Sequence, residues 1–200
     1  MSDVTTQAAD ILRVLDLASV VVFAITGALV ASRKQMDIVG FLWLGVVTGV
    51  GGGTVRDLLL GAPVFWVANA TPLALCLGAA AIVHFSAHLV ASRYRFLLYL
   101  DAFGMALVTT VGTAKALDMG AGPLVAVCMG VITAAVGGIL RDILGQEPSI
   151  LLRRDIYVTA AACGSIALLV ADGVGVPRLA AIGIAIGVGF GLRALAVRFD

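Results

Sequence analysis

The sequence predicts an all-α membrane protein with seven transmembrane helices, and three observations lead to that class. Of its 200 residues, 61% are hydrophobic and only 12% are charged, whereas charged residues make up about a quarter of an average soluble domain. Long apolar runs recur between short clusters of charged residues, Gly and Pro. These runs lack the alternation of polar and apolar residues that a transmembrane β-barrel needs, so each run is predicted to be a helix.

Seven spans fit the chain, because one bilayer crossing takes about 20 residues. The predicted spans, in order, are residues 11–32, 38–60, 72–89, 96–116, 123–144, 156–171 and 177–197. The first span is expected to be retained, since Asp3 and Asp10 precede the first basic residue, Arg13, whereas a signal peptide begins with positive charge. The last two spans are short, but flanking arginines can reach the interface. Six spans is the alternative count.

The distribution of basic residues predicts the orientation in the membrane. With seven spans, nine Lys and Arg residues fall on one side and four on the other, and basic residues stay preferentially in the cytoplasm. The N-terminus is therefore expected outside and the C-terminus in the cytoplasm. The net charge is only +1, so no nucleic-acid partner is expected.

The most informative feature is an internal repeat at an offset of 85 residues, which aligns 50–59 with 135–144 without a gap. The matched pairs include Asp16 with Asp101, Gly27 with Gly112, Ala31 with Ala116, Gly45 with Gly130, Thr48 with Thr133, Arg56 with Arg141, Asp57 with Asp142 and Pro63 with Pro148. We therefore expect a single transmembrane domain over 1–200. Its first repeat covers about 11–90, its second about 96–172, and its seventh helix about 177–197.

Each predicted repeat contains three spans, an odd number, so the second repeat enters the membrane from the opposite face. Inverted repeats of this kind are typical of transport proteins. A duplicated scaffold without any pathway is the alternative.

Glycine runs lie at matching places inside the second and fifth spans, Gly51, Gly52 and Gly53 in the one and Gly137 and Gly138 in the other. Glycine weakens a helix, so both helices are predicted to break there. In lipid a broken helix is tolerated only where it is buried in protein or lines a cavity. The carbonyl ends of the half-helices would then meet near the midplane, where their partial negative charge suits a cation.

Close helix packing is the alternative explanation for such glycines. Gly45, Gly49 and Gly53 are four residues apart in the second span. The same spacing recurs in the seventh span at Gly183, Gly187 and Gly191. Packing is the favoured interpretation for the seventh span, because no polar or charged residue interrupts 179–192.

An Arg-Asp pair follows each glycine motif by about one turn, at 56–57 and at 141–142. A charge inside a membrane needs water, a partner or the interface. Adjacent residues on a helix do not face each other, so each Arg and Asp is expected to pair across the structure. The expected partners are the equivalent pair in the other repeat, or Asp16 and Asp101 near the ends of the first and fourth spans, and anchoring at the interface is the alternative. The candidate pathway residues are Gly51, Gly52, Gly53, Gly137, Gly138, Thr48, Thr133, Asp16, Asp101, Arg56, Asp57, Arg141 and Asp142.

Lys115 breaks the symmetry of the repeat, because its counterpart is Val30. It is a possible gate, and an interfacial anchor is the alternative role. Aromatic residues near the ends of the spans are expected at the membrane interface. These residues are Trp43, Trp66, Tyr94, Tyr99 and Tyr157.

Metal, cofactor and enzyme chemistry are not expected. His84 and His88 lie four apart near the end of the third span, and we favour an interfacial pair over a metal site because no carboxylate or thiol is near in sequence. The three cysteines stand singly. No set of nucleophile, base and orienting residue is visible, so an enzyme is not predicted.

The two three-helix repeats, each with its glycine motif and Arg-Asp pair, and the seventh helix resemble the bacterial branch of the TRIC family, the trimeric intracellular cation channels. The resemblance covers nearly the whole chain. It implies a homotrimer in the lipids of the bacterial inner membrane, with a pore for potassium and other monovalent cations inside each subunit. Glycine-kinked second and fifth helices would line that pore. Val136 stands where a third glycine would match Gly51, which implies a less pronounced second kink.

Two functions of different classes remain open from the sequence. One is a potassium channel. The other is a secondary transporter of a small zwitterion such as glycine, because related bacterial sequences are also labelled glycine transporters and the N-termini of half-helices can hold a carboxylate.

Overall fold

A computed structural model describes residues 2–87, 93–148 and 156–199, and every regular element within them is a helix. In chain order the helices are α1 (Ser2–Arg33), α2 (Ile38–Leu59), α3 (Phe65–Ala68), α4 (Thr71–Ser86), α5 (Arg93–Asp118), α6 (Pro123–Leu144), α7 (Tyr157–Gly173) and α8 (Arg178–Phe199). The all-α class is confirmed. Each predicted span overlaps one helix, whereas the short helix α3 was not predicted.

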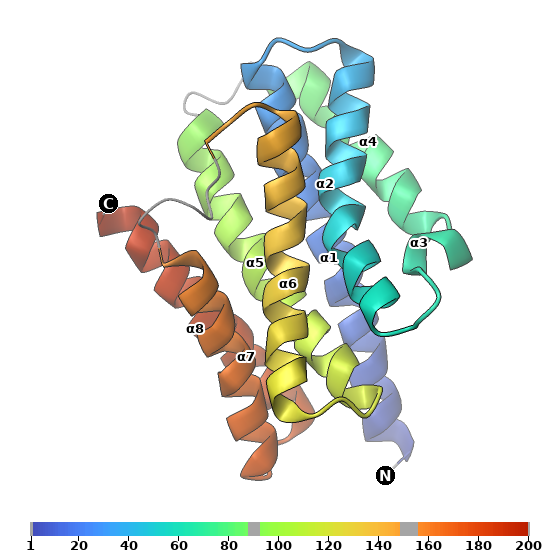
Figure 1. The fold of residues 1–200 in the computed structure, drawn as a ribbon, viewed down its shortest axis with the longest axis vertical. Helices are drawn as coiled ribbons and strands as arrows, with labels where there is room; N and C mark the ends of the chain where they lie inside the picture. The colour runs from blue at the N-terminus through green and yellow to red at the C-terminus, as the bar shows by residue number, and fades with distance from the viewer. Residues whose placement is uncertain (1, 88–92, 149–155, 200) are drawn as a thin grey trace.

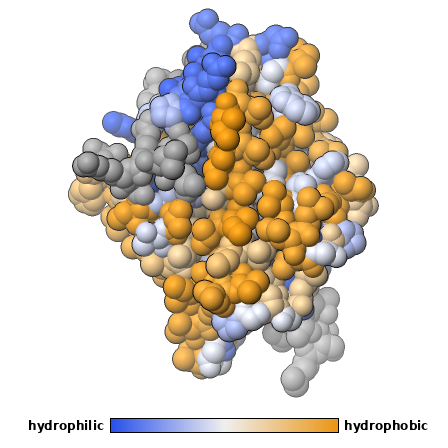
Figure 2. Space-filling view, viewed as in Figure 1, coloured by the Kyte–Doolittle hydropathy of each residue, from blue (hydrophilic) through white to orange (hydrophobic). Residues whose placement is uncertain are grey.

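Five of the described helices, α1, α2, α5, α6 and α8, are long and apolar enough to cross a membrane. The apolar helices α4 and α7 have 16 and 17 residues, which gives lengths of about 24 and 26 Å against a hydrocarbon core of about 30 Å. The predicted third span ends at residue 89, which lies outside the described residues. Figure 2 shows a broad hydrophobic surface on one face, with hydrophilic residues gathered toward its upper end.

Helix packing follows the internal repeat. Helices α1, α2 and α4 pack against one another, and so do their counterparts α5, α6 and α7. The two groups meet through matched helices, because α1 contacts α5 and α2 contacts α6. Figure 1 shows α2 and α6 running in opposite directions side by side, while α8 lies outside both groups against α5 and α7.

The turns that end the first two helices of each group are also repeated. Gln35 after α1 and Gly120 after α5 are 85 residues apart, and both have a left-handed φ, 54° and 82°. Gly61 after α2 and Gln146 after α6 form the second matched pair, with φ of 66° and 49°. A left-handed residue just after a helix is a common way to end it. The two halves of the chain therefore share backbone conformation even where side chains differ.

Helices α2 and α6 cross with their backbones in direct contact. A Cβ atom added to Gly137 would lie 2.7 Å from the carbonyl oxygen of Thr48, and one added to Gly52 would overlap the carbonyl oxygen of Thr133. The two contacts are equivalent, because Gly137 and Thr133 follow Gly52 and Thr48 by 85 residues. The helices therefore cross where the two repeats are related by their internal symmetry, and neither glycine has room for a side chain.

The predicted breaks in these helices are wrong. α2 is helical throughout Ile38–Leu59 and α6 throughout Pro123–Leu144, including Gly51–Gly53 and both matched glycines. An uninterrupted helix keeps its own backbone hydrogen bonds, and each bond lost in apolar surroundings would cost free energy. Gly51, Gly52 and Gly137 serve close approach between the helices, which is the alternative that the sequence left open.

Packing at the other glycines differs between the second and seventh spans. Gly45 faces Ala80, and Gly49 faces Cys76, so packing is confirmed in α2. In α8, Cβ atoms added to three glycines would meet nothing within 4 Å, so the packing predicted for them is wrong within the subunit. These are Gly183, Gly187 and Gly191. The helix instead turns Gly189 toward Ala106 of α5.

The crossing of α2 and α6 predicts a large difference between two Gly-to-Ala substitutions. Gly52→Ala should destabilise the protein by about 1–3 kcal/mol or more, because the added methyl overlaps backbone that cannot rotate away. Gly183→Ala on open helix surface should be neutral or stabilise by about 0.5–1 kcal/mol, the usual advantage of Ala within a helix. Thermal unfolding of both variants in detergent measures the difference. Equal melting temperatures would contradict the close crossing.

Candidate functional site

The candidate site consists of two clusters of buried ion pairs related by the repeat. The first cluster consists of Asp16, Arg56, Asp57 and Lys115. The second cluster consists of Asp101, Arg141 and Asp142. Each is centred on an arginine near the C-terminal end of a helix at the crossing, and the arginine side chains are 0% exposed. All the predicted charged pathway residues therefore belong to one cluster or the other.

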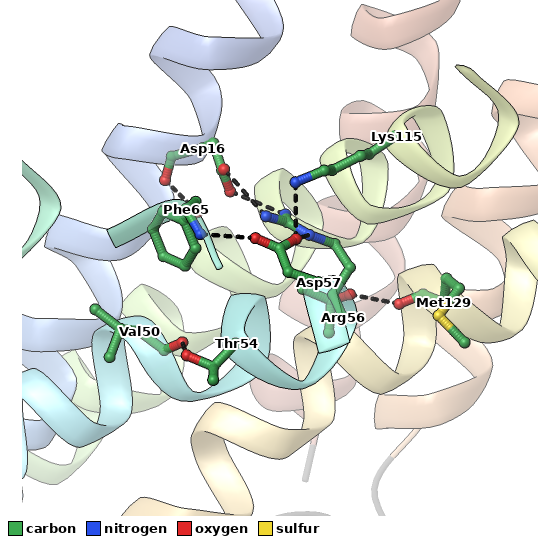
Figure 3. A network of polar contacts seen from close by, with 10 residues as sticks. Asp16, Val50, Thr54, Arg56, Asp57, Phe65, Lys115 and Met129 are labelled. Carbon is green, nitrogen blue, oxygen red and sulfur yellow. Dashed lines mark hydrogen bonds and ion pairs between the residues drawn. The ribbon is translucent and has the colours of Figure 1, made fainter. Parts of the chain in front are cut away.

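The first cluster joins α1, α2, α3 and α5 (Figure 3). Arg56 donates from Nε to Asp57 Oδ1 at 2.8 Å and from Nη1 and Nη2 to the two carboxylate oxygens of Asp16 at 3.2 and 3.3 Å. Asp57 also accepts from Lys115 Nζ at 2.7 Å and from the backbone N–H of Phe65 at 3.0 Å. Two positive and two negative charges thus meet in one network.

The second cluster repeats the central part of the first. Arg141 Nε donates to Asp142 Oδ1 at 2.9 Å, and Arg141 Nη1 donates to Asp101 Oδ1 at 2.7 Å and to Thr26 Oγ1 at 3.1 Å. Tyr157 lies beside it and donates its hydroxyl proton to the backbone carbonyl of Ala134 at 3.0 Å. Thr26 comes from α1, so this cluster also joins the two repeats.

The predicted pairing across the structure is confirmed for Asp16 and Asp101, but the exclusion of pairing between neighbours is wrong. The long arginine side chain curls back at the helix end, so its Nε reaches the carboxylate of the next residue in both repeats. Interfacial anchoring does not describe either arginine, because both are fully buried inside the subunit. A buried guanidinium needs these aspartate partners, since burying it unpaired would cost several kcal/mol.

The two clusters differ in their access to space. Beside the first lies a cavity of about 470 Å³, whose lining includes Arg13, Asp16, Asn69, Pro72 and Lys115. A second cavity of about 240 Å³ also reaches Asp16 and Lys115. A space of about 10 Å³ beside the second cluster is bounded by Asp101, Ala135, Gly138, Ile139, Arg141, Asp142 and Tyr157. Among the described residues, the first cluster therefore borders larger cavities than the second.

The remaining predicted pathway residues lie at the crossing itself. Thr48 and Thr133 are 1% exposed, and each donates its hydroxyl proton to a carbonyl one turn earlier, that of Leu44 or Met129. Their carbonyl oxygens face Gly137 and Gly52. Lys115 is 30% exposed and is bonded to Asp57, so it lies between the open cavity and the first cluster.

Some residues near the clusters were missed or misplaced by sequence reasoning. Tyr157 was expected at the interface but is 4% exposed and lies beside the second cluster. Arg193 was counted only as a loop charge, yet it is fully buried in α8. The sequence did contain a signal for this burial, because Arg193 lies four residues before the predicted end of the seventh span. His84 is half-buried and edge-on to Phe41 at 4.7 Å, whereas His88 lies outside the described residues.

Fold and clusters together define a multi-pass helical membrane protein built from two inverted repeats. A family model described as "Glycine transporter" matches the chain twice, over residues 13–88 and 98–173. Both ends of the second match are shifted by the same 85 residues that relate the repeats. The double match covers well over half of the chain and coincides with the two groups of three helices.

Relatives and solved structures identify the family more closely. The UPF0126 inner membrane protein YadS of Escherichia coli K12 is 45% identical over 154 residues, which is 76% of this chain and 74% of that protein. A solved TRIC trimeric intracellular cation channel orthologue from Rhodobacter sphaeroides is 51% identical, with a TM-score of 0.93 over 94% of this chain and 98% of that one. A prokaryotic TRIC channel is 27% identical, with a TM-score of 0.90 over 96% and 98%.

The chain belongs to the UPF0126 family. Its fold is that of the bacterial TRIC proteins. The matched solved structures are ion channels and not enzymes. The E. coli relative is described as an inner membrane protein, in agreement with the five apolar helices described above.

The buried clusters predict a strong effect from losing one arginine. Arg141→Met leaves Asp101 and Asp142 buried without their guanidinium and should destabilise the protein by about 3–5 kcal/mol. The matched control is Lys34→Met, because Lys34 is 36% exposed and pairs with Glu147 at 3.5 Å, an exposed type of pair that contributes about 0–1 kcal/mol. Thermal unfolding in detergent measures both. An unchanged melting temperature in the Arg141 variant would show that the cluster does not stabilise the fold.

Proposed function

We propose that the protein is a channel for monovalent cations, chiefly potassium, with a pore inside each subunit of a homotrimer. The observation that carries the proposal is the pair of matched arginine–aspartate clusters at the two ends of the α2–α6 crossing. The solved relatives described as TRIC cation channels support it. The pore would run between α2 and α6 in a bacterial inner membrane, with the N-terminus outside, the C-terminus in the cytoplasm and seven crossings.

The described arrangement corresponds to a closed pore. Backbone contact at the two glycines leaves no room for an ion between Gly52 and Thr133. Opening therefore requires α2 and α6 to separate or bend, and the glycine motifs are where a helix bends most easily. Separation would expose the Thr48 and Thr133 carbonyl oxygens, which are suitable ligands for a potassium ion.

A secondary transporter of a small zwitterion is the second candidate. It is supported by the description of the matching family model as a glycine transporter. The mixed charges along the large cavity, Arg13 and Lys115 with Asp16, also suit an amino acid that carries both an ammonium and a carboxylate.

Recording from purified protein in planar bilayers separates the two candidates. A channel should give unitary currents whose reversal potential follows the potassium gradient, because a pore conducts down the electrochemical gradient of its ion. Glycine uptake into proteoliposomes, with empty liposomes as the control, tests the transporter. Saturable uptake without unitary currents would overturn the channel and support the alternative.

Lys115 is proposed as a gate, because its ammonium holds Asp57 at the border of the open cavity. Lys115→Met removes that charge-assisted hydrogen bond and should raise the open probability by a factor of about 5 or more, since such a bond contributes about 1 kcal/mol or more. Lys34→Met removes an equal charge with no described contact to Asp57 and should leave gating unchanged. Equal open probabilities in the two variants would leave Lys115 without a gating role.

A further inference from the structure

The short helix α3 is fastened to α2 beside the glycine motif by three separate contacts. The backbone N–H of Phe65 donates to Asp57 Oδ2 at 3.0 Å, and the indole N–H of Trp66 donates to Thr54 Oγ1 at 2.8 Å. The Phe65 ring lies directly on Gly53, because a Cβ atom added to this glycine would lie 2.6 Å from the ring. Together these contacts cover just over one turn of α2.

Thr54 connects this fastening to the other side of the glycine motif. Its hydroxyl accepts from Trp66 and donates to the backbone carbonyl of Val50 at 2.7 Å (Figure 3). Val50 and Thr54 stand immediately before and after the three glycines, where a helix bends most easily. A bend that opens this face of α2 must therefore strain or break the chain from indole to hydroxyl to carbonyl.

The repeat shows that the bond from Thr54 is specific to α2. The counterpart of Thr54, 85 residues later, is Ile139, whose hydrocarbon side chain forms no hydrogen bond. The motif of α6 also has one glycine fewer, because Val136 stands where α2 has Gly51. The helix with the more flexible motif is thus the one that has this additional bond.

The same short helix is joined to the first charged cluster. Asp57 accepts from Lys115 at Oδ1 and from the backbone of Phe65 at Oδ2, so the two groups hold one carboxylate between them. The guanidinium carbon of Arg56 also lies 5.7 Å from the centre of the Phe65 ring, within the range of a cation–π contact. A displacement of Asp57 therefore acts on the position of α3.

We propose that α3 is a splint that keeps α2 straight at its glycine motif, and that Trp66 is the positioning residue of this splint. Release of Trp66 from Thr54 permits α2 to bend, which is a movement by which the proposed channel opens. The inference deepens the proposed channel function and rests on it for its physiological meaning. The stiffness of α2 itself can be measured without any current.

Two conservative substitutions remove the splint bond and retain the packing around it. Trp66→Phe keeps an aromatic ring and removes the indole N–H. Thr54→Val keeps the shape of the side chain and removes the hydroxyl. The matched control is Trp43→Phe, because Trp43 is 62% exposed on α2 and lies about three turns before Thr54.

Hydrogen exchange followed by mass spectrometry in detergent measures local opening of the α2 backbone. Trp66→Phe and Thr54→Val should each raise the exchange rate over residues 51–57 by about fivefold, the factor that corresponds to loss of a hydrogen bond contributing about 1 kcal/mol. The matched segment of α6, residues 136–142, is the internal reference and should exchange as in the parent, and so should both segments in the Trp43 variant. The double variant should exchange no faster than Thr54→Val alone, because both changes act on one bond.

Unchanged exchange over 51–57 in both variants would overturn the splint, and so would an equal rise over 136–142, which would indicate loosening of the whole bundle. Bilayer recording tests the role in opening separately. If the parent carries unitary currents, Trp66→Phe should raise the open probability several-fold, and an unchanged value would overturn that role. If the parent carries no currents, the channel proposal fails while the exchange result still decides the splint.

Discussion

A guanidinium inside an apolar helix bundle is stable only with polar or charged partners, and this constraint organises the helices around Arg56 and Arg141. Arg56 and Arg141 stand near the ends of the helices that cross at the centre of the molecule. The neighbouring aspartate accepts from Nε of each arginine, and the first helix of the same repeat provides a second carboxylate, Asp16 or Asp101, for the remaining N–H donors. Pairing over 40 residues of sequence thus fixes α1 beside α2 and α5 beside α6.

Duplication supplies the same solution twice, and the differences between the copies make the surroundings of the two clusters unequal. Lys115 stands where the first repeat has Val30, and it reaches across to the first cluster. Tyr157 stands where the first repeat has Pro72, and it fills space beside the second. Both special residues belong to the second repeat, yet they act on opposite clusters. The second repeat therefore contributes one residue to the surroundings of each cluster.

Sequence reasoning recovered what the repeat and the apolar pattern encode. The apolar pattern predicts the positions of the spans, and the 85-residue repeat identifies the matched arginines. The cost of an unpaired charge predicts that these arginines have partners, and Asp16 and Asp101 were among those expected. The predicted breaks at the glycines were wrong because the same residue permits both a broken helix and a close crossing. Only the position of the opposing helix, seen in the contacts of Gly52 and Gly137, decides between these uses.

Other features depend on long-range geometry that no local pattern reports. Tyr157 near the start of a span has the sequence signature of an interfacial aromatic residue, and its burial becomes visible only when α8 is packed beside it. The curled Arg-Asp contact was excluded by a rule about helix faces that holds for short side chains. Arginine is long enough to reach around the helix end, so the rule does not apply to it.

Charge balance explains how one cluster could both exclude and admit a cation in the proposed channel. With Lys115 in place, the first cluster has two positive and two negative groups, so it offers a cation no net attraction. Withdrawal of the lysine leaves a net charge of −1 beside the open cavity. At a separation of about 4 Å and an effective dielectric constant of about 20, such a charge attracts a cation by about 4 kcal/mol. In the proposed channel, movement of one half-buried ammonium thus changes the cluster from a neutral barrier into an entry site, while the buried arginine keeps the remaining aspartates in position.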